Sequence, residues 1–524
     1  MDRDPKMLVQ ILYLCSTGCG GRHSFAFNCY QGIDLLMLLV TDRSVLACRN
    51  HFQKINVCFS WNYSIGCLTM GRKRFKSTPR EVIDVEPDRI SCLPGHVIDC
   101  ILSYLPIKEA VRTSVLSSNW RHKWYTLPNL VFDTQCISHA KFAEKRFMKF
   151  VDHVLLVHSG AINMFKFDDS RQRVTYNDAY VDRWILHLTG RSIKEFVMDF
   201  YTDKQFDLPC RLFSFGSLRH LKLKWCWLEP PMTYESFRNL KSIDIKLVTV
   251  DQEAFENLIS NCPLLEELKL AEVDLDGLGQ INIRAPNLKL FQIVGEFKGI
   301  SFDNTFQLTT IVIHSWLDLN SESNQPKLHG RSSNLLEFFD HQPHIQSLDI
   351  GGYFLKYLAA GVLPVKLPTP CIHLSNLSLR INFYDLNQIL AALCLLRSSP
   401  NLRKLELLAR RFRADTLTSP TYCWEDIFSE PAMAFRVQHV RIVGGGISGT
   451  KSELDFIKYI LLYSPVLEKM TVKPVVNVAP KLMKALMRFK RASGEAKVIW
   501  EDPAEVIWEN PFYVIWEDPF VNEE

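Results

Sequence analysis

A six-residue pattern recurs eleven times between residues 193 and 472, with apolar residues at its first, fourth and sixth positions. The fourth and sixth positions alternate as the inward residues of a short β-strand do. The first copies follow one another at 20 to 25 residues, the later ones at 28 to 37. One such unit cannot bury its own apolar face, so the pattern predicts units stacked into a solenoid. The copies begin at Ile193, Leu218, Leu240, Leu265, Leu288, Leu308, Ile345, Leu374, Leu402, Val437 and Leu467.

The segments between the copies predict how the chain returns from one strand to the next. Five copies have a proline two residues before their first apolar residue, and helical stretches at 254–260, 388–399 and 453–463 precede three copies. Proline stops a helix and favours an extended lead-in to a strand. We therefore expect each unit to be a helix, a turn and a short strand. This pattern resembles leucine-rich repeats in a degenerate form, because the asparagine that normally follows the strand is mostly missing.

Residues 88–124 predict a small helical module with more apolar surface than it can enclose. Pro94 suits the first turn of a helix, and an apolar stripe follows before Pro106: Val97, Ile98, Ile101, Leu102 and Leu105. A second stripe contains Ala110, Val111, Val115 and Leu116. We expect Ser117 or Ser118 to cap a third helix that carries Trp120 and Trp124.

This module resembles an F-box in its LP start, its ILSYLP and AVRTSVLSSNWRHKW segments, and the LPNLVFD that follows. The resemblance implies a small orthogonal helical bundle that docks on the Skp adaptor of a cullin-based ubiquitin ligase. It also implies that these residues meet the adaptor or support those that do: Leu93, Pro94, Ile98, Ile101, Leu102, Leu105, Val111, Val115, Leu116 and Trp120. Gly95 and His96 replace the polar or acidic residues usual after LP. Glycine weakens a helix start by roughly 1 kcal/mol or less, so we expect a lower adaptor affinity.

Residues 424–493 resemble the FBD domain of plant F-box proteins. The likeness lies in Trp424-Glu425, the segment VQHVRIV, a glycine turn, ELDFIKYILLYSPVLEKMTV, and RFKRAS at 488–493. F-box, leucine-rich repeats and FBD in this order are the layout of a large plant family. The resemblance implies an α/β chain in which an N-terminal helical F-box-like module precedes an irregular leucine-rich-repeat solenoid ending in an FBD-like region.

The sequence therefore predicts six segments. They are a Cys-rich extension without stable structure at 1–69, a basic linker at 70–87, the F-box at 88–135, degenerate leucine-rich repeats at 136–418, an FBD-like region at 419–496 and an acidic tail at 497–524. We expect the functional protein to begin near Met70. The tail repeats VIWEDPAE, VIWENPFY and VIWEDPF and holds no Lys or Arg after Lys497. It is predicted to fray; the alternative is a linear peptide that offers Trp500, Trp508 and Trp516 to a basic groove.

Composition excludes several classes of function. A net charge of +4 is too small to indicate nucleic acid as the main partner. No apolar run reaches the roughly 18 residues of a membrane span. Fifteen scattered cysteines are typical of reduced thiols and indicate the nucleus or cytoplasm.

Motifs for metal or nucleotide binding are incomplete. Cys15, Cys19, His23 and Cys29 lack a second, well-separated ligand pair, so we expect no metal. Gly444, Gly446 and Gly449 match a dinucleotide fingerprint, but Lys473 and Pro474 stand where its acidic residue belongs. We predict no cofactor, no catalytic residue and no enzymatic activity.

The resemblance implies a substrate-recognition subunit of an SCF-type ubiquitin ligase, with the F-box on the Skp adaptor, and through it a cullin, and the repeats on a target protein. We expect target contacts on exposed strand residues and following loops, including those near Trp225, Trp227 and Trp316. The alternative is a repeat scaffold without a ligase role, in which the helices only cap the array.

Overall fold

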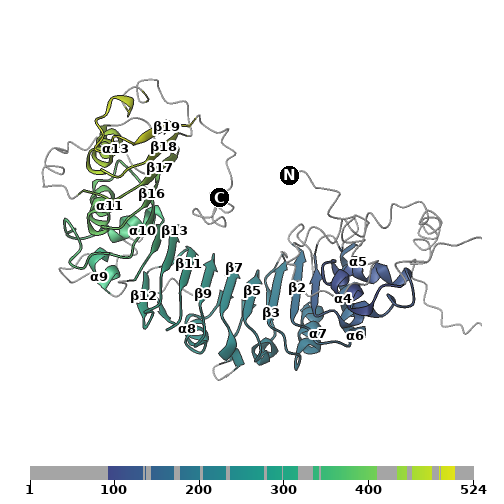
Figure 1. Cartoon of the computed structure of the whole chain (residues 1–524). Helices are drawn as coiled ribbons and strands as arrows, with labels where there is room; N and C mark the ends of the chain where they lie inside the picture. The colour runs from purple at the N-terminus through teal and green to yellow at the C-terminus, as the bar shows by residue number, and fades with distance from the viewer. Residues whose placement is uncertain are drawn as a thin grey trace, which may run out of the picture. The chain divides into compact units, whose positions relative to one another are not determined.

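The structure is a computed structural model of the whole chain (Figure 1). It describes residues 92–133, 136, 143–169, 178–200, 204–231, 236–275, 280–297, 299–316, 334–340, 344–409, 434–444, 451–474, 483 and 486–501. The chain forms two compact units, one up to Met164 and one from Phe165. The Cys-rich extension, the basic linker and residues 502–524 of the tail lie outside the described residues.

The first unit is a helical module followed by a strand and a longer helix. Its elements are α4 (Gly95–Ser103), α5 (Ile107–Arg112), the 3-10 helices η2 (Thr113–Val115) and η3 (Lys123–Thr126), β1 (Asn129–Phe132) and α6 (Ala143–Val157). Pro94 and Pro106 are the N-caps of α4 and α5, so the prolines separate the two helices as expected. His158 Nε2 lies 2.8 Å from the Leu127 carbonyl oxygen, and Phe150 packs against Phe132. Residues 143–164 thus lie in the same compact unit as the F-box-like module.

The third helix of the module is not an α-helix. Turns occupy 118–122, and the single 3-10 turn η3 follows. Trp120 and Trp124 are nevertheless both buried, at 1% and 5% exposure. The spacing of the two tryptophans therefore predicts correctly that both side chains enter the core. Their burial does not require a regular helix between them.

The second unit is built on one parallel sheet. Its strands run in the order β2-β3-β5-β7-β9-β11-β13-β14-β15-β16-β17-β18-β19 (Figure 1). All eleven copies of the six-residue pattern form strands of this sheet, and every strand begins at the third residue of its copy. These strands are β3 (Glu195–Phe200), β5 (His220–Lys224), β7 (Ser242–Lys246), β9 (Glu267–Ala271), β11 (Leu290–Gly295), β13 (Thr310–Ser315), β14 (Ser347–Ile350), β15 (Asn376–Ile381), β16 (Lys404–Ala409), β17 (His439–Gly444) and β18 (Lys469–Pro474).

Three strands outside the two small sheets described below went unpredicted. β1 and β2 (Met164–Asp169) follow the same rule, because Leu127, Leu130 and Phe132 and then Ile162, Phe165 and Phe167 occupy the three apolar positions and are buried. β19 (Lys497–Trp500) pairs with β18 and has no apolar residue at the first position. The boundary of the predicted tail at 497 was therefore wrong, since the first VIW copy is the last strand of the sheet.

The returns between strands are less uniform than the helix–turn–strand unit predicts. α7 (Asp178–Leu188), α8 (Gln252–Ser260), α9 (Asn334–Asp340), α10 (Gly352–Leu358), α11 (Leu386–Ser398) and α13 (Lys451–Tyr463) are α-helices, whereas η5 (Cys210–Ser214) and η6 (Ser236–Asn239) are single 3-10 turns. Other returns carry two small parallel sheets, β4 (Phe206–Leu208), β6 (Cys226–Leu228) and β8 (Thr249–Val250), and β10 (Gln280–Arg284) with β12 (Gly299–Asp303). α8, α11 and α13 lie along one side of the main sheet (Figure 1). Asp251 and Asp385 cap α8 and α11 with their carboxylates.

Directly after several of the strands lies a residue with left-handed backbone conformation, and its backbone links neighbouring repeats. These repeats mostly lack the asparagine that normally follows the strand of a leucine-rich repeat. Trp225, Leu247 and Glu272 have φ of 60°, 54° and 52°, each at the eighth position from the start of its copy. Their backbone N–H groups donate to carbonyl oxygens of the next strand, Lys246, Ala271 and Val294, at 2.6 to 3.0 Å. Backbone hydrogen bonds therefore continue one residue beyond the strands, without a side-chain ladder at this turn.

The three apolar positions of each copy contribute to the core of this unit, together with apolar residues of the returns such as Phe255 and Ile389. Leu240, Ile243 and Ile245 of one copy, for example, are all fully buried. The second and third residues of the copies are partly or fully exposed, whereas some fifth residues, such as Asp349 and Ser378, are buried.

Candidate functional site

The predicted adaptor-binding residues fall into a buried and an accessible set. Ile98, Leu102 and Trp120 are at most 1% exposed and form the core of the module. Pro94 is exposed, and half of the Val115 side chain surface is exposed, at 50%. The other predicted residues are partly buried: Leu93, Ile101, Leu105, Val111 and Leu116. The accessible set is apolar, which is the chemistry of a surface that a partner covers.

Gly95 lies beside Lys123 rather than beside open solvent. The Lys123 ammonium forms an ion pair with Asp99 at 3.0 Å and lies 3.5 Å from the Gly95 carbonyl oxygen. A Cβ atom at Gly95 would lie 3.1 Å from Lys123 Nζ. The ammonium thus occupies the space next to the helix start, where the sequence lacks an acidic side chain, and joins η3 to α4.

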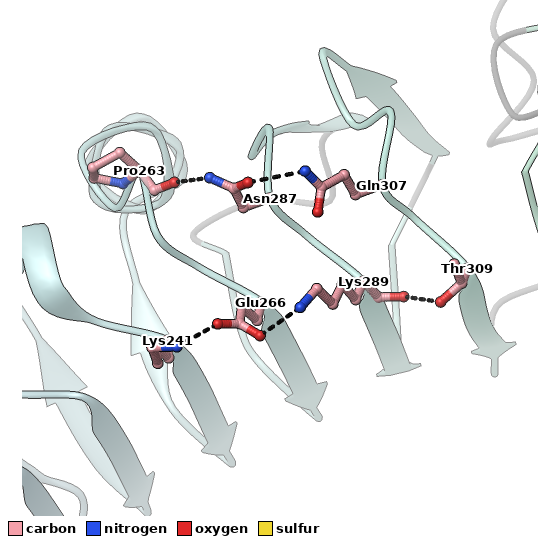
Figure 2. A network of polar contacts seen from close by, with 7 residues as sticks. All are labelled: Lys241, Pro263, Glu266, Asn287, Lys289, Gln307 and Thr309. Atoms are coloured by element: carbon pink, nitrogen blue, oxygen red, sulfur yellow. Dashed lines mark hydrogen bonds and ion pairs between the residues drawn. The ribbon is translucent and has the colours of Figure 1, made fainter.

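In the second unit a row of polar residues lies directly before the strands, at the second position of each copy; we name it the strand-start row. Glu266 accepts hydrogen bonds from Lys241 Nζ at 2.6 Å and from Lys289 Nζ at 2.8 Å (Figure 2). These two lysines hold the pKa of Glu266 at about 2, first through the hydrogen bond from Lys241. Because two cations share one carboxylate, the triad keeps one net positive charge.

Amides at the position just before four of the copies link neighbouring repeats to one another. Asn287 Nδ2 donates to the Pro263 carbonyl at 2.7 Å, and Gln307 Nε2 donates to Asn287 Oδ1 at 3.1 Å (Figure 2). Asn239 and Asn401 donate in the same way to Gly216 and Ile372. This amide ladder, Asn239, Asn287, Gln307 and Asn401, does the work of the asparagine missing after the strands. The dipeptides Pro286-Asn287 and Pro400-Asn401 are its signal in the sequence.

A hollow of about 390 Å³ lies at the start of β11 to β15, beside this network; we name it the strand-start pocket. The rings of His344 and His373 pack 5.4 Å apart on its wall, and Phe306 is 72% exposed. Its lining contains no carboxylate: Lys289, Phe306, Gln307, Thr309, His344, Gln346 and His373. An exposed aromatic ring beside hydrogen-bond donors suits a peptide with an apolar anchor and acidic or carbonyl acceptors.

The three tryptophans singled out in the sequence differ in exposure. Trp227, on β6, is 39% exposed, whereas the indole nitrogens of Trp225 and Trp316 are buried. Trp227 is therefore the most exposed of the three, and Trp225 and Trp316 are partly buried.

Buried charges on the strand face near β13 to β17 form structural pairs. His314 Nε2 lies 3.1 Å from Asp349 Oδ1. Burial alone would raise the pKa of the Asp349 carboxyl, but His314, Arg380 and the Ser378 hydroxyl hold it below its ordinary value. Arg441 contacts Glu406 at 3.3 Å, and burial raises the pKa of that carboxyl.

Other side chains that are able to react or to bind metals lie in surroundings that suit a structural role. Burial raises the pKa of Cys262 and Cys371 to about 12 and that of Cys394 to about 11, which makes these thiols poor nucleophiles. The eight described cysteines are free thiols. Among described residues no cluster of His, Cys, Asp or Glu has the geometry of a metal site, and no helix is long and apolar enough to span a membrane. Gly446 and Gly449 of the dinucleotide-like motif, and Trp424, lie outside the described residues, as do Trp508 and Trp516.

Three family models match this chain in order. The F-box domain matches residues 90–132, the model for LRR repeats of FBD-associated F-box protein At5g56370 matches 181–407, and the FBD matches 436–472. The first match ends with β1, the second contains β3 to β15, and the third spans β17, α13 and most of β18. Each model thus falls on the part of the structure in which the sequence predicted that domain.

Two relatives match most of this chain, and a third matches less than half of it. F-box/FBD/LRR-repeat protein At1g13570 of Arabidopsis thaliana is 34% identical over 424 residues, which is 79% of this chain and 98% of the relative. F-box/FBD/LRR-repeat protein At5g53840 of the same plant is 27% identical and covers 74% of this chain and 88% of its own. F-box/LRR-repeat protein At3g59200 matches 42% of this chain, at 33% identity, and 44% of its own.

Solved structures resemble the repeats only loosely. An internalin from Listeria monocytogenes covers 67% of this chain and 93% of its own at 10% identity, with a TM-score of 0.26, too low to support an argument. The family assignment depends instead on the relative that matches over nearly its full length and on the three models in sequence order, as the F-box and FBD motifs predicted. The chain belongs to the plant F-box/FBD/LRR-repeat protein family.

Proposed function

We propose that this chain is the substrate-recognition subunit of an SCF-type cullin ubiquitin ligase, active in the nucleus or cytoplasm. F-box domains generally bind Skp-type adaptors, and F-box/LRR proteins are generally non-catalytic adaptors. The observation that carries the proposal is the accessible apolar set on a module that matches the F-box model. In this role the chain contributes binding, and ubiquitin transfer follows from proximity to enzymes held by the rest of the complex.

The adaptor would cover the accessible set, with Leu93, Leu105 and Val115 as its main contacts. Fully covering a leucine or valine contributes about 1.5–3 kcal/mol, and these residues are already partly covered. Losing two such side chains should therefore weaken binding by more than about tenfold. Ile98, Leu102 and Trp120 would act indirectly, by keeping the helices in place.

The test is co-purification of the full chain with a plant Skp adaptor. Wild type should bind, and Leu93→Ala combined with Leu105→Ala should bind at least tenfold more weakly. Leu156→Ala is the matched control, because Leu156 is a 71%-exposed leucine of the same unit on α6. Failure of the wild type to bind would overturn the proposal and favour a repeat scaffold without a ligase role.

The repeats would hold the target, and the strand-start pocket is the position that we propose for it. A target segment would place an apolar side chain against Phe306 and acceptors against the donors of the wall. Phe306→Ala should reduce the proteins captured with the chain under proteasome inhibition and leave adaptor binding unchanged. Phe489→Ala, at a half-buried phenylalanine of the same unit, serves as the control.

A further inference from the structure

The sheet of the second unit ends in a strand with one free edge. β19 is the last strand in the order and pairs with β18 in parallel, Lys497 opposite Lys469 and Ile499 opposite Thr471. The N–H groups of Lys497 and Glu501 donate toward β18, to Glu468 and Val472. Neighbouring residues of a strand point their backbone groups in opposite directions, so those of Val498 and Trp500 face the free edge.

This edge also exposes apolar surface. Ile499 is 37% exposed, and Val498 and Trp500 are only half-buried. An exposed, apolar edge strand with unpaired backbone groups is a template for another strand, and proteins normally cover it. None of the described residues forms a strand on that side of β19.

A cationic ladder leads across the sheet to the same edge. Its members lie on four neighbouring strands, and each is opposite the next in the register of the sheet: Lys404, His439, Lys469 and Lys497. Lys469 and Lys497 lie directly opposite each other, an arrangement that is unfavourable between like charges. Within the described part of the chain none of the three lysines has a carboxylate partner, and Glu468 lies 3.7 Å from His439. The end of the ladder lacks an anion beside Lys497.

The sequence after β19 repeats the sequence of β19. Val498-Ile499-Trp500 recurs as Val506–Trp508 and Val514–Trp516, and each copy ends in a glutamate. The five-residue connections EDPAE and ENPFY contain Asp-Pro or Asn-Pro. Loops of four or five residues join antiparallel strands, and these dipeptides favour turns. Because Val506–Trp508 has the same sequence as Val498–Trp500 of β19, it has the same intrinsic preference for a strand.

We propose that the second copy, Val506–Glu509, adds to the free edge of β19 as an antiparallel strand. A loop over 501–505 sets Trp500 opposite Val506, Ile499 opposite Ile507 and Lys497 opposite Glu509. Opposite residues of an antiparallel pair share one face of the sheet. Ile507 then covers the exposed Ile499, and Glu509 supplies the missing anion at the end of the cationic ladder. The acidic tail thereby caps the repeat sheet. The free edge of β19 is occupied by a segment of the same chain and not by a second copy of the chain.

A register-specific disulfide tests the pairing in the full chain. Directly opposite residues that exchange no backbone hydrogen bonds lie about 4.5 Å apart at Cα, within disulfide range. Ile499→Cys with Ile507→Cys should crosslink within one chain, identified by mass spectrometry of the linked peptides. Ile499→Cys with Trp508→Cys, one residue out of register, is the control and should not. A link between two chains would assign the edge to a second copy and overturn the proposal, as would no link in either variant.

Amide exchange gives an independent measurement that needs no cysteine. The Val498 and Trp500 amides should exchange at least about tenfold more slowly in the full chain than in a chain ending at Glu501. Glu509→Lys should speed their exchange, whereas Glu517→Lys, the same position in the third copy, should not. Equal rates in the full and shortened chains, or equal effects of the two substitutions, would contradict the proposed register.

Discussion

Single residues in this chain act mainly by connecting neighbouring repeats or elements. Glu266 joins Lys241 and Lys289 from the two adjacent copies, and Lys123 joins η3 to α4. All of these side chains are partly exposed, so solvent screens each contact and its contribution is small. Their effect is to fix the position of side chains rather than to supply most of the folding free energy.

The Glu266 contacts predict a specific dependence of stability on pH. The folded-state pKa of about 2 lies below the ordinary 4.5, so the contribution is complete above pH 4.5 and is lost as pH falls toward 2. Glu266→Gln should melt at a lower temperature than wild type at pH 7. The difference should shrink between pH 4.5 and pH 2 in thermal melts at constant ionic strength. A difference that grows on acidification would contradict this explanation.

Gly95 predicts a stabilising substitution in the first unit. Gly95→Ala removes the conformational freedom of glycine at the helix start and should stabilise the module by up to about 1 kcal/mol. The added Cβ meets the end of a flexible lysine side chain, which can shift by a few tenths of an ångström. Denaturant unfolding should show the gain, and adaptor affinity should rise or stay unchanged. Destabilisation would mean that the contact of Lys123 with the Gly95 carbonyl matters more than helix propensity.

At the scale of elements the eleven strands and the three helices α8, α11 and α13 were predictable, and the other returns were not. Each strand needs three buried side chains at fixed spacing, and that requirement is visible in eleven copies of the sequence. The copies at Leu127 and Ile162 went unrecognised because phenylalanines fill most of their later positions, at Phe132, Phe165 and Phe167. A return only has to span two strand ends, and a helix, a 3-10 turn or a short strand does so equally well.

The candidate sites were predictable to different degrees. The F-box residues could be named, because Ile98 and Leu102 are core residues at helical spacing and Trp120 joins the same core. The sequence did not separate these core residues from the accessible ones. The strand-start pocket was missed, because Phe306, His344 and His373 come from three repeats and no spacing rule joins them. The amide ladder was missed because Asn and Gln at a turn have many local explanations.

The amide ladder predicts different effects for two similar asparagines. Asn287 donates one hydrogen bond to Pro263 and accepts another from Gln307, whereas Asn401 donates one to Ile372. Asn401→Ala should cost about 1 kcal/mol of unfolding free energy or less, and Asn287→Ala more, about 1–2 kcal/mol. Urea unfolding of both variants measures the difference. Equal losses would show that the contact between the two side chains contributes nothing.

At the scale of the whole molecule, the two compact units divide the work. The sheet of the second unit is continuous from β3 to β19, so each strand is supported by its neighbours in sequence order. The F-box helices form a separate core in the first unit. Damage to the middle of the sheet should therefore affect target capture and spare the docking of the adaptor.

Leu268→Ala tests this division. Leu268 is fully buried in β9, and truncation to alanine should cost about 2–5 kcal/mol in the second unit. Calorimetry should show a lower transition for the repeats, and adaptor co-purification should be unchanged at temperatures below that transition. Loss of adaptor binding at those temperatures would show that the units do not fold independently.

The fixed start of every strand has a consequence for how such a chain can change over generations. Because each strand begins two residues after its first apolar residue, insertions and deletions fall in the returns, whose copies are spaced from 20 to 37 residues. Gains and losses of sequence there leave the alignment of side chains across strands intact. The returns can diversify in length, whereas the strands can diversify only by substitution, one side chain at a time.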